Sequence, residues 1–164
     1  MGESMNNTAI VFVSKYGTTE KVARLLAGRL GNGVILISLM RNKKPDISSF
    51  DTIILGTSIY AGMPQKRMRE FCKNNKEILL QRNIGLFICG MQPDSDNRDA
   101  EMVNAYPESL RRQAKANAFL GGEFLFDKLN FFEKLVIRKV SKVTGSISAI
   151  DIKAVEEFAK KMKR

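Results

Sequence analysis

A short run of hydroxyl-bearing residues with one glycine follows the first apolar segment of the chain. Residues 9–13 are apolar without interruption, and apolar residues with helical spacing begin after residue 19. A loop that joins a buried strand to a helix directs backbone N–H groups and hydroxyls to one spot, at the positive end of the helix dipole. The sequence therefore predicts a phosphate-binding loop, although a loop of this composition can also serve only as a cap and turn. Its members are Ser14, Lys15, Tyr16, Gly17, Thr18 and Thr19.

Two further glycine-containing segments follow predicted strands, at residues 56–62 and 90–94. In an open parallel sheet, ligands bind beyond the carboxyl ends of the strands, where the strand order reverses. We therefore expect the three loops to meet at one edge of the sheet. Tyr60 is the only aromatic residue of the second loop, so it either stacks on a planar ligand or simply covers the loop. The residues predicted to line this part of the site are Thr57, Ser58, Ile59, Tyr60, Ala61, Gly62, Gly90, Met91 and Gln92.

Strands and helices are expected to alternate along the chain. Apolar runs predict strands at residues 9–13, 34–39, 52–55, 84–89 and 118–126. Helical spacing predicts helices at residues 19–30, 65–80 with a break near 74–75, 107–115 and 150–162, with connecting segments at 40–50 and 93–99. This alternation predicts a three-layer α/β fold, in which a doubly wound parallel five-stranded sheet has the order 2-1-3-4-5.

The chain is strongly basic. Its 164 residues suit one domain spanning 1–164, and 27 Lys and Arg against 17 Asp and Glu give a net charge of +10. Such a surface favours an anionic lipid face or an acidic protein as a partner, or it is simply solvated. Nucleic acid is not predicted as a partner, because no recognised nucleic-acid-binding motif is present.

The sequence lacks the usual residues of several kinds of site. There is no histidine, and the two cysteines, Cys72 and Cys89, are far apart, so no metal site is expected. We expect both thiols to be reduced, in a cytoplasmic protein. No apolar run approaches the roughly 20 residues of a membrane-spanning helix, and the first residues lack a signal-peptide core. No dedicated acid–base pair is visible, so no catalytic residue is predicted.

A segment at about residues 127–148 is longer than a connection between the last strand and the last helix requires. Within it, residues 128–142 place apolar side chains at helical spacing and carry a single acid, Glu133. This pattern predicts a basic amphipathic helix, which either lies on an anionic membrane surface or covers the core of the domain. Its basic residues are Lys128, Lys134, Arg138, Lys139 and Lys142.

The first loop resembles the phosphate loop of the flavodoxin family, whose pattern is Thr/Ser-x-Thr-Gly-x-Thr-Glu. Tyr16 stands where that pattern usually has Thr, and the resemblance covers about residues 8–160. It implies that FMN binds. The matching residues are Ser14, Gly17, Thr19 and Glu20.

The resemblance also implies roles for the three loops. The hydroxyls of Ser14, Thr18 and Thr19 would donate hydrogen bonds to the FMN phosphate. Gly17 would allow close approach of the backbone, and Lys15 would add positive charge. The second and third loops would line the isoalloxazine ring, where their backbone groups set the flavin potential.

The basic charge and the extra segment are similar to the menaquinone-dependent protoporphyrinogen oxidase branch of the flavodoxin-like proteins. Further short similarities lie at residues 56–59 and 135–140. This resemblance implies an FMN-dependent oxidoreductase that passes electrons from a reduced small-molecule substrate, such as protoporphyrinogen, to a quinone. The protein would then be cytoplasmic and peripheral on the inner face of the cell membrane. The alternative is a soluble flavodoxin-type electron carrier that docks on a redox partner protein.

Overall fold

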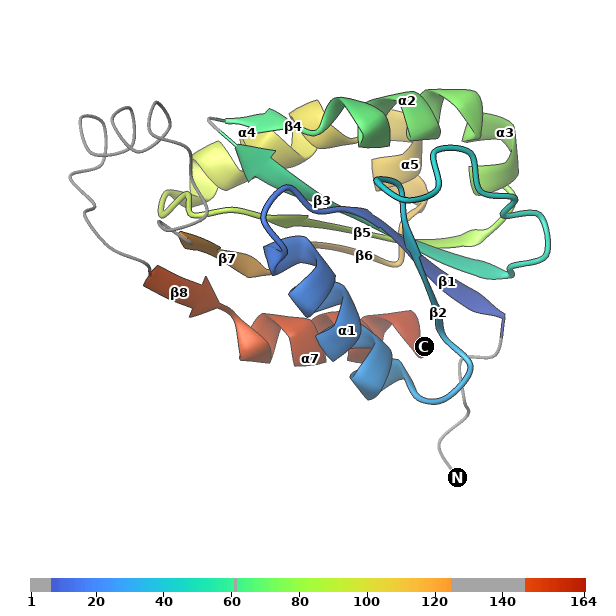
Figure 1. Ribbon diagram of the computed structural model, residues 1–164, viewed down its shortest axis with the longest axis horizontal. Coiled ribbons are helices and arrows are strands. Elements are labelled where there is room, and N and C mark those ends of the chain that lie inside the picture. The colour runs from blue at the N-terminus through green and yellow to red at the C-terminus, as the bar shows by residue number, and fades with distance from the viewer. Residues whose placement is uncertain (1–6, 61, 125–146) are drawn as a thin grey trace.

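A parallel sheet forms the centre of the protein (Figure 1). The computed structural model describes residues 7–60, 62–124 and 147–164. Five strands lie in the order β2-β1-β3-β5-β6, with every neighbouring pair parallel, which confirms the predicted fold class and strand order. The strands are β1 (Thr8–Val13), β2 (Ile35–Ser38), β3 (Thr52–Tyr60), β5 (Asn83–Cys89) and β6 (Ala116–Phe119).

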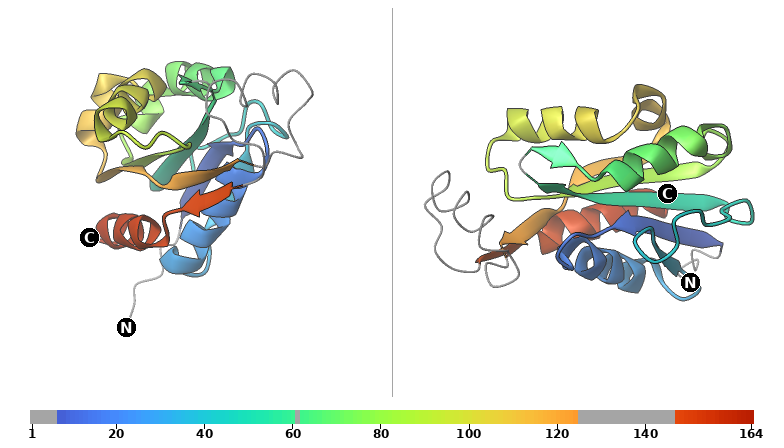
Figure 2. Two further views of the ribbon diagram at one scale, coloured as in Figure 1. Left: turned by 90° about the vertical axis from the view of Figure 1, so that its left-hand side faces the viewer. Right: turned by 45° about the horizontal axis from the view of Figure 1, so that its top comes forward.

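Helices cover both faces of this sheet (Figures 1 and 2). One face carries α1 (Thr18–Leu30) and α7 (Ile152–Met162), which contact each other. The opposite face carries α2 (Lys66–Asn74), α3 (Lys76–Leu79), α4 (Ser95–Ala105) and α5 (Glu108–Gln113). Because both faces are covered, the central strands are continuous apolar runs rather than alternating ones.

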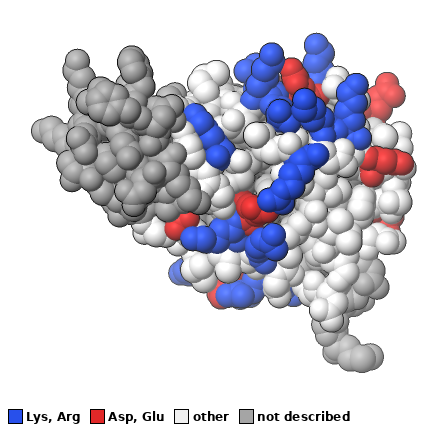
Figure 3. Space-filling model, in the orientation of Figure 1, with Lys and Arg blue, Asp and Glu red and all other residues white. Residues whose placement is uncertain are grey.

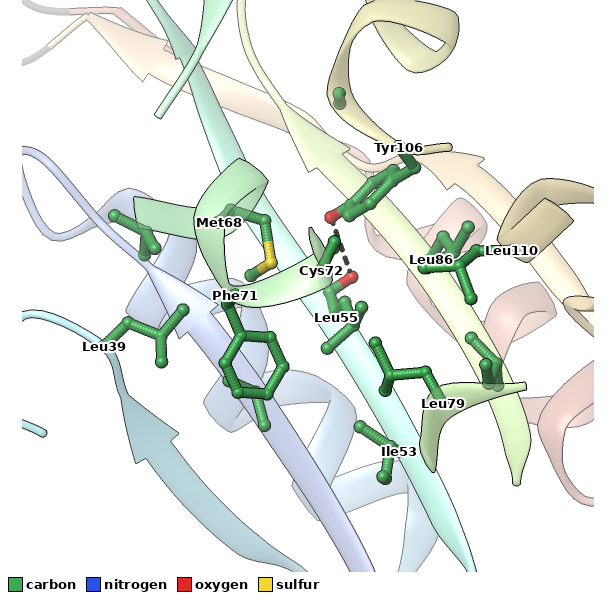
Figure 4. Close-up of a cluster of buried hydrophobic side chains, with 14 of the residues drawn as sticks. Leu39, Ile53, Leu55, Met68, Phe71, Cys72, Leu79, Leu86, Tyr106 and Leu110 are labelled. Carbon is green, nitrogen blue, oxygen red and sulfur yellow. Dashed lines mark hydrogen bonds between the residues drawn. The ribbon is translucent and has the colours of Figure 1, made fainter. Parts of the chain in front are cut away.

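The side chains of β1 show how the core divides into two layers. All six residues of the strand are buried. Ile10 and Phe12 pack on the side of α1 and α7, whereas Val11 and Val13 pack on the other side. Figure 4 shows this second cluster, in which the Tyr106 hydroxyl lies 3.0 Å from the carbonyl oxygen of Leu55 and 2.7 Å from that of Phe87. Tyr106 therefore ties α4 to two central strands.

Two predicted connecting segments prove to be regular structure. β3 does not end at residue 55 but runs to Tyr60, and then pairs antiparallel with the short strand β4 (Met63–Pro64). The prediction of a loop from residue 56 is therefore wrong, because the strand continues beside β5 as far as the pair Ser58 and Cys89. The prediction of a loop at 93–99 is also wrong in part. The Asp94 carboxylate accepts hydrogen bonds from the first-turn N–H groups of α4, which begins at Ser95.

The predicted fifth strand, at residues 118–126, is divided between two sheets. Its first part belongs to β6, which begins at Ala116, while β7 (Gly121–Phe124) pairs antiparallel with β8 (Ile147–Ile150). Gly121 has a φ of 81°, and a Cβ there would lie 2.1 Å from the carbonyl oxygen of Ala149, so only glycine fits the change of direction. The last helix begins at Ile152, not at residue 150, because Asp151 caps it.

The predicted amphipathic helix at 128–142 lies outside the described residues, and β7 and β8 flank that part of the chain. Among the residues that are described, no helix is long and apolar enough to cross a membrane. The same residues contain no group of three or more metal-ligating side chains.

Candidate functional site

The first predicted loop lies between the carboxyl end of β1 and the first turn of α1. Gly17 precedes the helix with a φ of 98°, a left-handed conformation that side chains disfavour, and its N–H donates to Ser14 Oγ at 2.9 Å. No side chain in the described part of the chain caps α1. The first-turn N–H groups, at the positive end of the helix dipole, are therefore suited to an anion. Because Ser14 Oγ accepts from Gly17, its own proton is directed elsewhere.

The two threonines of the loop face protein groups. Thr18 donates its hydroxyl proton to Glu123 Oε1 at 3.2 Å, and Lys21 Nζ lies 3.1 Å from the other oxygen of that carboxylate. The Thr19 side chain is completely buried, next to the Cys89 thiol. Among the three hydroxyls predicted to donate to phosphate, that of Ser14 is partly exposed and donates to no acceptor in the described part of the chain. Thr18 and Thr19 still present their backbone N–H groups in the first helical turn.

An aromatic and cationic contact joins the first loop to the end of β3. The ring centroids of Tyr16 and Tyr60 are 6.2 Å apart, with planes at 67°. Lys15 Nζ lies 3.6 Å from the centroid of the Tyr60 ring and 5.2 Å from that of Tyr16, within the range of a cation–π interaction. The structure thus brings the phosphate loop and Tyr60 together, as expected from the strand order.

The third loop packs between the end of β3 and β7. The Gly90 N–H donates to the carbonyl oxygen of Gly121 at 3.0 Å, and a Cβ on Gly90 would lie 3.4 Å from that of Ile59. Met91 and Gln92 follow as half-buried residues, and Arg98 Nε donates to the Gln92 carbonyl oxygen at 2.6 Å. The three loops therefore lie at one edge of the sheet.

The remaining predicted residues belong to the end of β3 and the turn after it. Thr57 is buried, and its hydroxyl accepts a weak 3.4 Å hydrogen bond from the Gln65 N–H. Ser58 Oγ is buried and has no hydrogen-bond partner among the described residues. Gly62 lies in the turn between β3 and β4, and Ala61 lies outside the described residues.

Comparison with known proteins identifies the family. Residues 9–151 match the family described as the flavodoxin domain. The chain belongs to that family. The flavodoxin of Buchnera aphidicola is 30% identical over 116 residues, which are 69% of this chain and 67% of that protein. Escherichia coli protoporphyrinogen IX dehydrogenase (quinone) is 19% identical over 145 residues, which are 84% of this chain and 80% of that protein.

The fold of this flavodoxin-domain protein is also found among solved structures. A mutant flavodoxin of Fusobacterium nucleatum, solved with bound flavin mononucleotide, superposes with a TM-score of 0.55 at 15% identity. The superposition covers 97% of this chain and 96% of that one. FMN is the cofactor of this family, so the predicted cofactor is confirmed.

The residues present in this flavodoxin domain fit FMN. The first turn of α1 has no side-chain cap, and Gly17 is left-handed, an arrangement that a phosphate would fit. The unpaired Ser58 hydroxyl provides a polar group at the end of β3, where the ring system would lie. Both cysteine thiols, in contrast, are unsuited to redox work. Burial raises the pKa of each to about 12, so they stay protonated at neutral pH.

Glu123 also lies beside the phosphate loop, and the sequence analysis did not single it out. Burial tends to raise the pKa of its carboxyl, but hydrogen bonds from Lys21, Ser148 and Thr18 outweigh burial and hold the pKa below its ordinary value. The carboxylate thus stays ionised beside the phosphate loop. Glu123 is 105 positions from Thr18, and no local motif marks that pairing, so only the arrangement of β7 beside α1 reveals it.

Proposed function

We propose that the protein is an FMN-dependent oxidoreductase that passes electrons from a reduced substrate to a quinone, with protoporphyrinogen as the candidate substrate. The observation that carries the redox part of the proposal is the strand–loop–helix at Thr8–Val13 and Thr18–Leu30, with its uncapped helix and left-handed Gly17. Similarity to the E. coli quinone-dependent dehydrogenase over 84% of this chain supports the choice of substrate and acceptor.

Different residues of the site would bind the phosphate and the ring system of the cofactor. The Ser14 hydroxyl, the N–H groups of the first turn of α1 and the Lys15 charge would bind the phosphate. Tyr60 and the residues around Ser58 and Gly90 would lie against the ring system. FMN supplies the redox chemistry, because its ring accepts hydride or electrons directly, and the protein binds it, orients it and tunes its potential. No side chain of this chain is assigned a proton-transfer step.

The segment outside the described residues has a role in this proposal. The basic amphipathic pattern of residues 128–142 would place the protein on the cytoplasmic side of an anionic membrane, close to a lipid-soluble quinone. The β7–β8 ladder supports this arrangement, because it brings the two ends of that segment together at the Phe124 and Ile147 pair. Glu123 on β7, which contacts Thr18 of the phosphate loop, directly precedes Phe124, where the described part of that strand ends.

A soluble electron carrier is the second candidate. The observation that favours it is the 30% identity to the Buchnera flavodoxin. The two candidates differ in what oxidises the reduced flavin, a quinone or a partner protein.

One assay separates these candidates. The purified FMN-loaded protein is given protoporphyrinogen with a menaquinone analogue, and separately NADPH with a flavodoxin reductase, while the flavin absorbance is followed. The oxidoreductase predicts quinone-dependent formation of protoporphyrin with turnover. Reduction of the flavin by the reductase, without protoporphyrin formation beyond the rate of a protein-free control, would instead establish the carrier.

A further inference from the structure

A basic groove lies between α2 and the segment that follows β2. Its volume is about 660 Å³, with Lys43, Lys44 and Pro45 on one side and Arg67 and Phe71 on the other. Figure 3 shows Lys and Arg side chains gathered over this part of the molecule. Pro45 and Phe71 are buried and form the floor, whereas Lys43 and Lys44 are exposed at the rim.

The positive charge of the basic groove is poorly compensated. Glu70 is the one acid among its lining residues, and it pairs with Lys66 at 3.7 Å. Neither Lys43 nor Lys44 forms an ion pair with any residue that the structure describes. Arg67 is half-buried and held in place, because its Nη1 donates to the carbonyl oxygen of Leu39 at 3.0 Å. A fixed guanidinium and two free ammonium groups therefore face the solvent across the groove.

The basic groove extends along α2, from Arg67 in the first turn of the helix to Asn74 and Asn75 at its last turn, and both of its walls start near the edge of the sheet that carries the FMN loops. Its first wall leaves the sheet beside the end of β1, where the Leu39 N–H donates to the carbonyl oxygen of Phe12 at 2.9 Å. Arg41 then joins this wall to the first turn of α1 through Glu20, at 3.2 Å. The second wall, α2, begins two residues after the β4 strand that pairs with Tyr60. Both walls of the groove are therefore connected to the elements that carry the FMN loops.

We propose that the basic groove docks an acidic segment of a partner protein. The cations lie on both walls and along the rim, so they match a row of carboxylates better than a single small anion. The floor is recessed, which suits a projecting segment of polypeptide, whereas a flat lipid surface would meet only the rim. The groove thus provides complementarity of charge and shape to an acidic polypeptide segment. The proposal goes beyond the assigned cofactor and does not require the quinone activity.

The test uses the FMN-loaded protein and a fluorescent decaglutamate peptide as the acidic probe, with binding measured by anisotropy at low salt. Charge reversal of the rim, by Lys43→Glu with Lys44→Glu, should weaken peptide binding by about 10–30-fold, since two attractions become repulsions. The matched control is Lys153→Glu with Lys160→Glu on α7, in the opposite layer, which changes the net charge equally. This control should change peptide affinity by less than about 2-fold.

Three outcomes would overturn the proposal. An equal loss in both variants would show attraction by net charge alone. Displacement of the peptide by inorganic phosphate at low millimolar concentration would show a small-anion site. A loss of binding to phosphatidylglycerol vesicles in the rim variant, without a loss of peptide binding, would show a membrane surface. FMN affinity and quinone-coupled turnover of the rim variant are measured alongside and should stay at wild-type values, so failure of the docking proposal is separable from failure of the proposed function.

Discussion

Gly17 and Glu123 determine the shape of the phosphate loop in different ways. Gly17 supplies a left-handed backbone that the loop needs before it enters α1. Glu123 holds the first turn from outside the loop, through Thr18 and Lys21. The family resemblance implied a glycine that allows close approach at position 17, whereas its left-handed conformation comes from the structure. The contribution of Glu123 depends on a strand over 100 positions away, so no pattern of spacing could show it.

We expect Gly17→Ala to weaken both the fold and FMN binding. A side chain in the left-handed region costs roughly 1–2 kcal/mol, so the free energy of unfolding should fall by about that amount, and the displaced N–H groups should lower FMN affinity. Urea unfolding and flavin fluorescence titration measure the two effects. The control is Gly28→Ala in the same helix, where a Cβ meets nothing within 4 Å. This control should stabilise the protein by about 0.5–1 kcal/mol and leave FMN affinity unchanged. Similar behaviour of both variants would contradict the role given to Gly17.

Glu123→Gln should change how stability depends on pH. The folded pKa of Glu123 is below its ordinary value of 4.5, so the ionised carboxylate stabilises the fold above that pH, and this contribution is lost as the pH falls through the folded pKa. Near pH 7, the variant should be less stable by about 1.5–3 kcal/mol, the range of hydrogen bonds to a charged group. The difference from wild type should shrink below pH 4.5 in urea unfolding. A difference that stays constant across this range would show that Glu123 is not held in its ionised form by these contacts.

Individual elements show where the sequence was informative and where it was not. The apolar run before Ser14 and the helical spacing after it gave the first strand and helix within one residue at each end. The polar composition of residues 93–99, in contrast, gave no indication that α4 begins after Asp94. Residues 56–60 were assigned to a loop because of Gly56 and the hydroxyl residues after it, yet their main-chain pairing with β5 continues to Ser58. Long-range pairing outweighed local preference in that segment.

Gly121→Ala should separate β7 from β8. The added Cβ would meet the carbonyl oxygen of Ala149, and the positive φ adds strain, so we expect a loss of at least about 2 kcal/mol in the free energy of unfolding. Because the Gly90 N–H donates to the Gly121 carbonyl oxygen, its hydrogen exchange should also accelerate. Unchanged exchange at Gly90 would mean that the third loop does not depend on β7.

The molecule as a whole carries the FMN loops at one edge of its sheet and has a strongly positive net charge. Its +10 net charge is spread over the surface, but the basic groove and the segment at 128–142 are the two places where the charge has a proposed partner. The sequence indicated anionic partners or a merely solvated surface, and a segment at 128–142 that either lies on a membrane or covers the core. It could not locate the groove, because Lys43 and Arg67 come to line one groove only when the segment that follows β2 packs beside α2.

Binding to vesicles tests the proposed membrane role of the segment at 128–142. The wild-type protein should sediment with phosphatidylglycerol vesicles at low salt and much less at high salt, because each Lys or Arg near an anionic surface contributes about 1 kcal/mol that salt screens. Replacing residues 125–146 by Asn-Gly joins the paired Phe124 and Ile147 through a two-residue hairpin. This variant should keep FMN and lose sedimentation. If the wild-type protein does not sediment at low salt, the segment has no membrane role.

Titration of the apoprotein with FMN and with riboflavin tests the central claim most directly, because the two ligands differ by the phosphate alone. Each hydrogen bond to a charged group contributes roughly 1.5–3 kcal/mol, and the Ser14 hydroxyl and several first-turn N–H groups are available, so FMN should bind at least about 100-fold more tightly than riboflavin. Quenching of flavin fluorescence measures both affinities under the same conditions. Equal affinities, or no quenching by either ligand, would contradict an FMN site built on the phosphate loop.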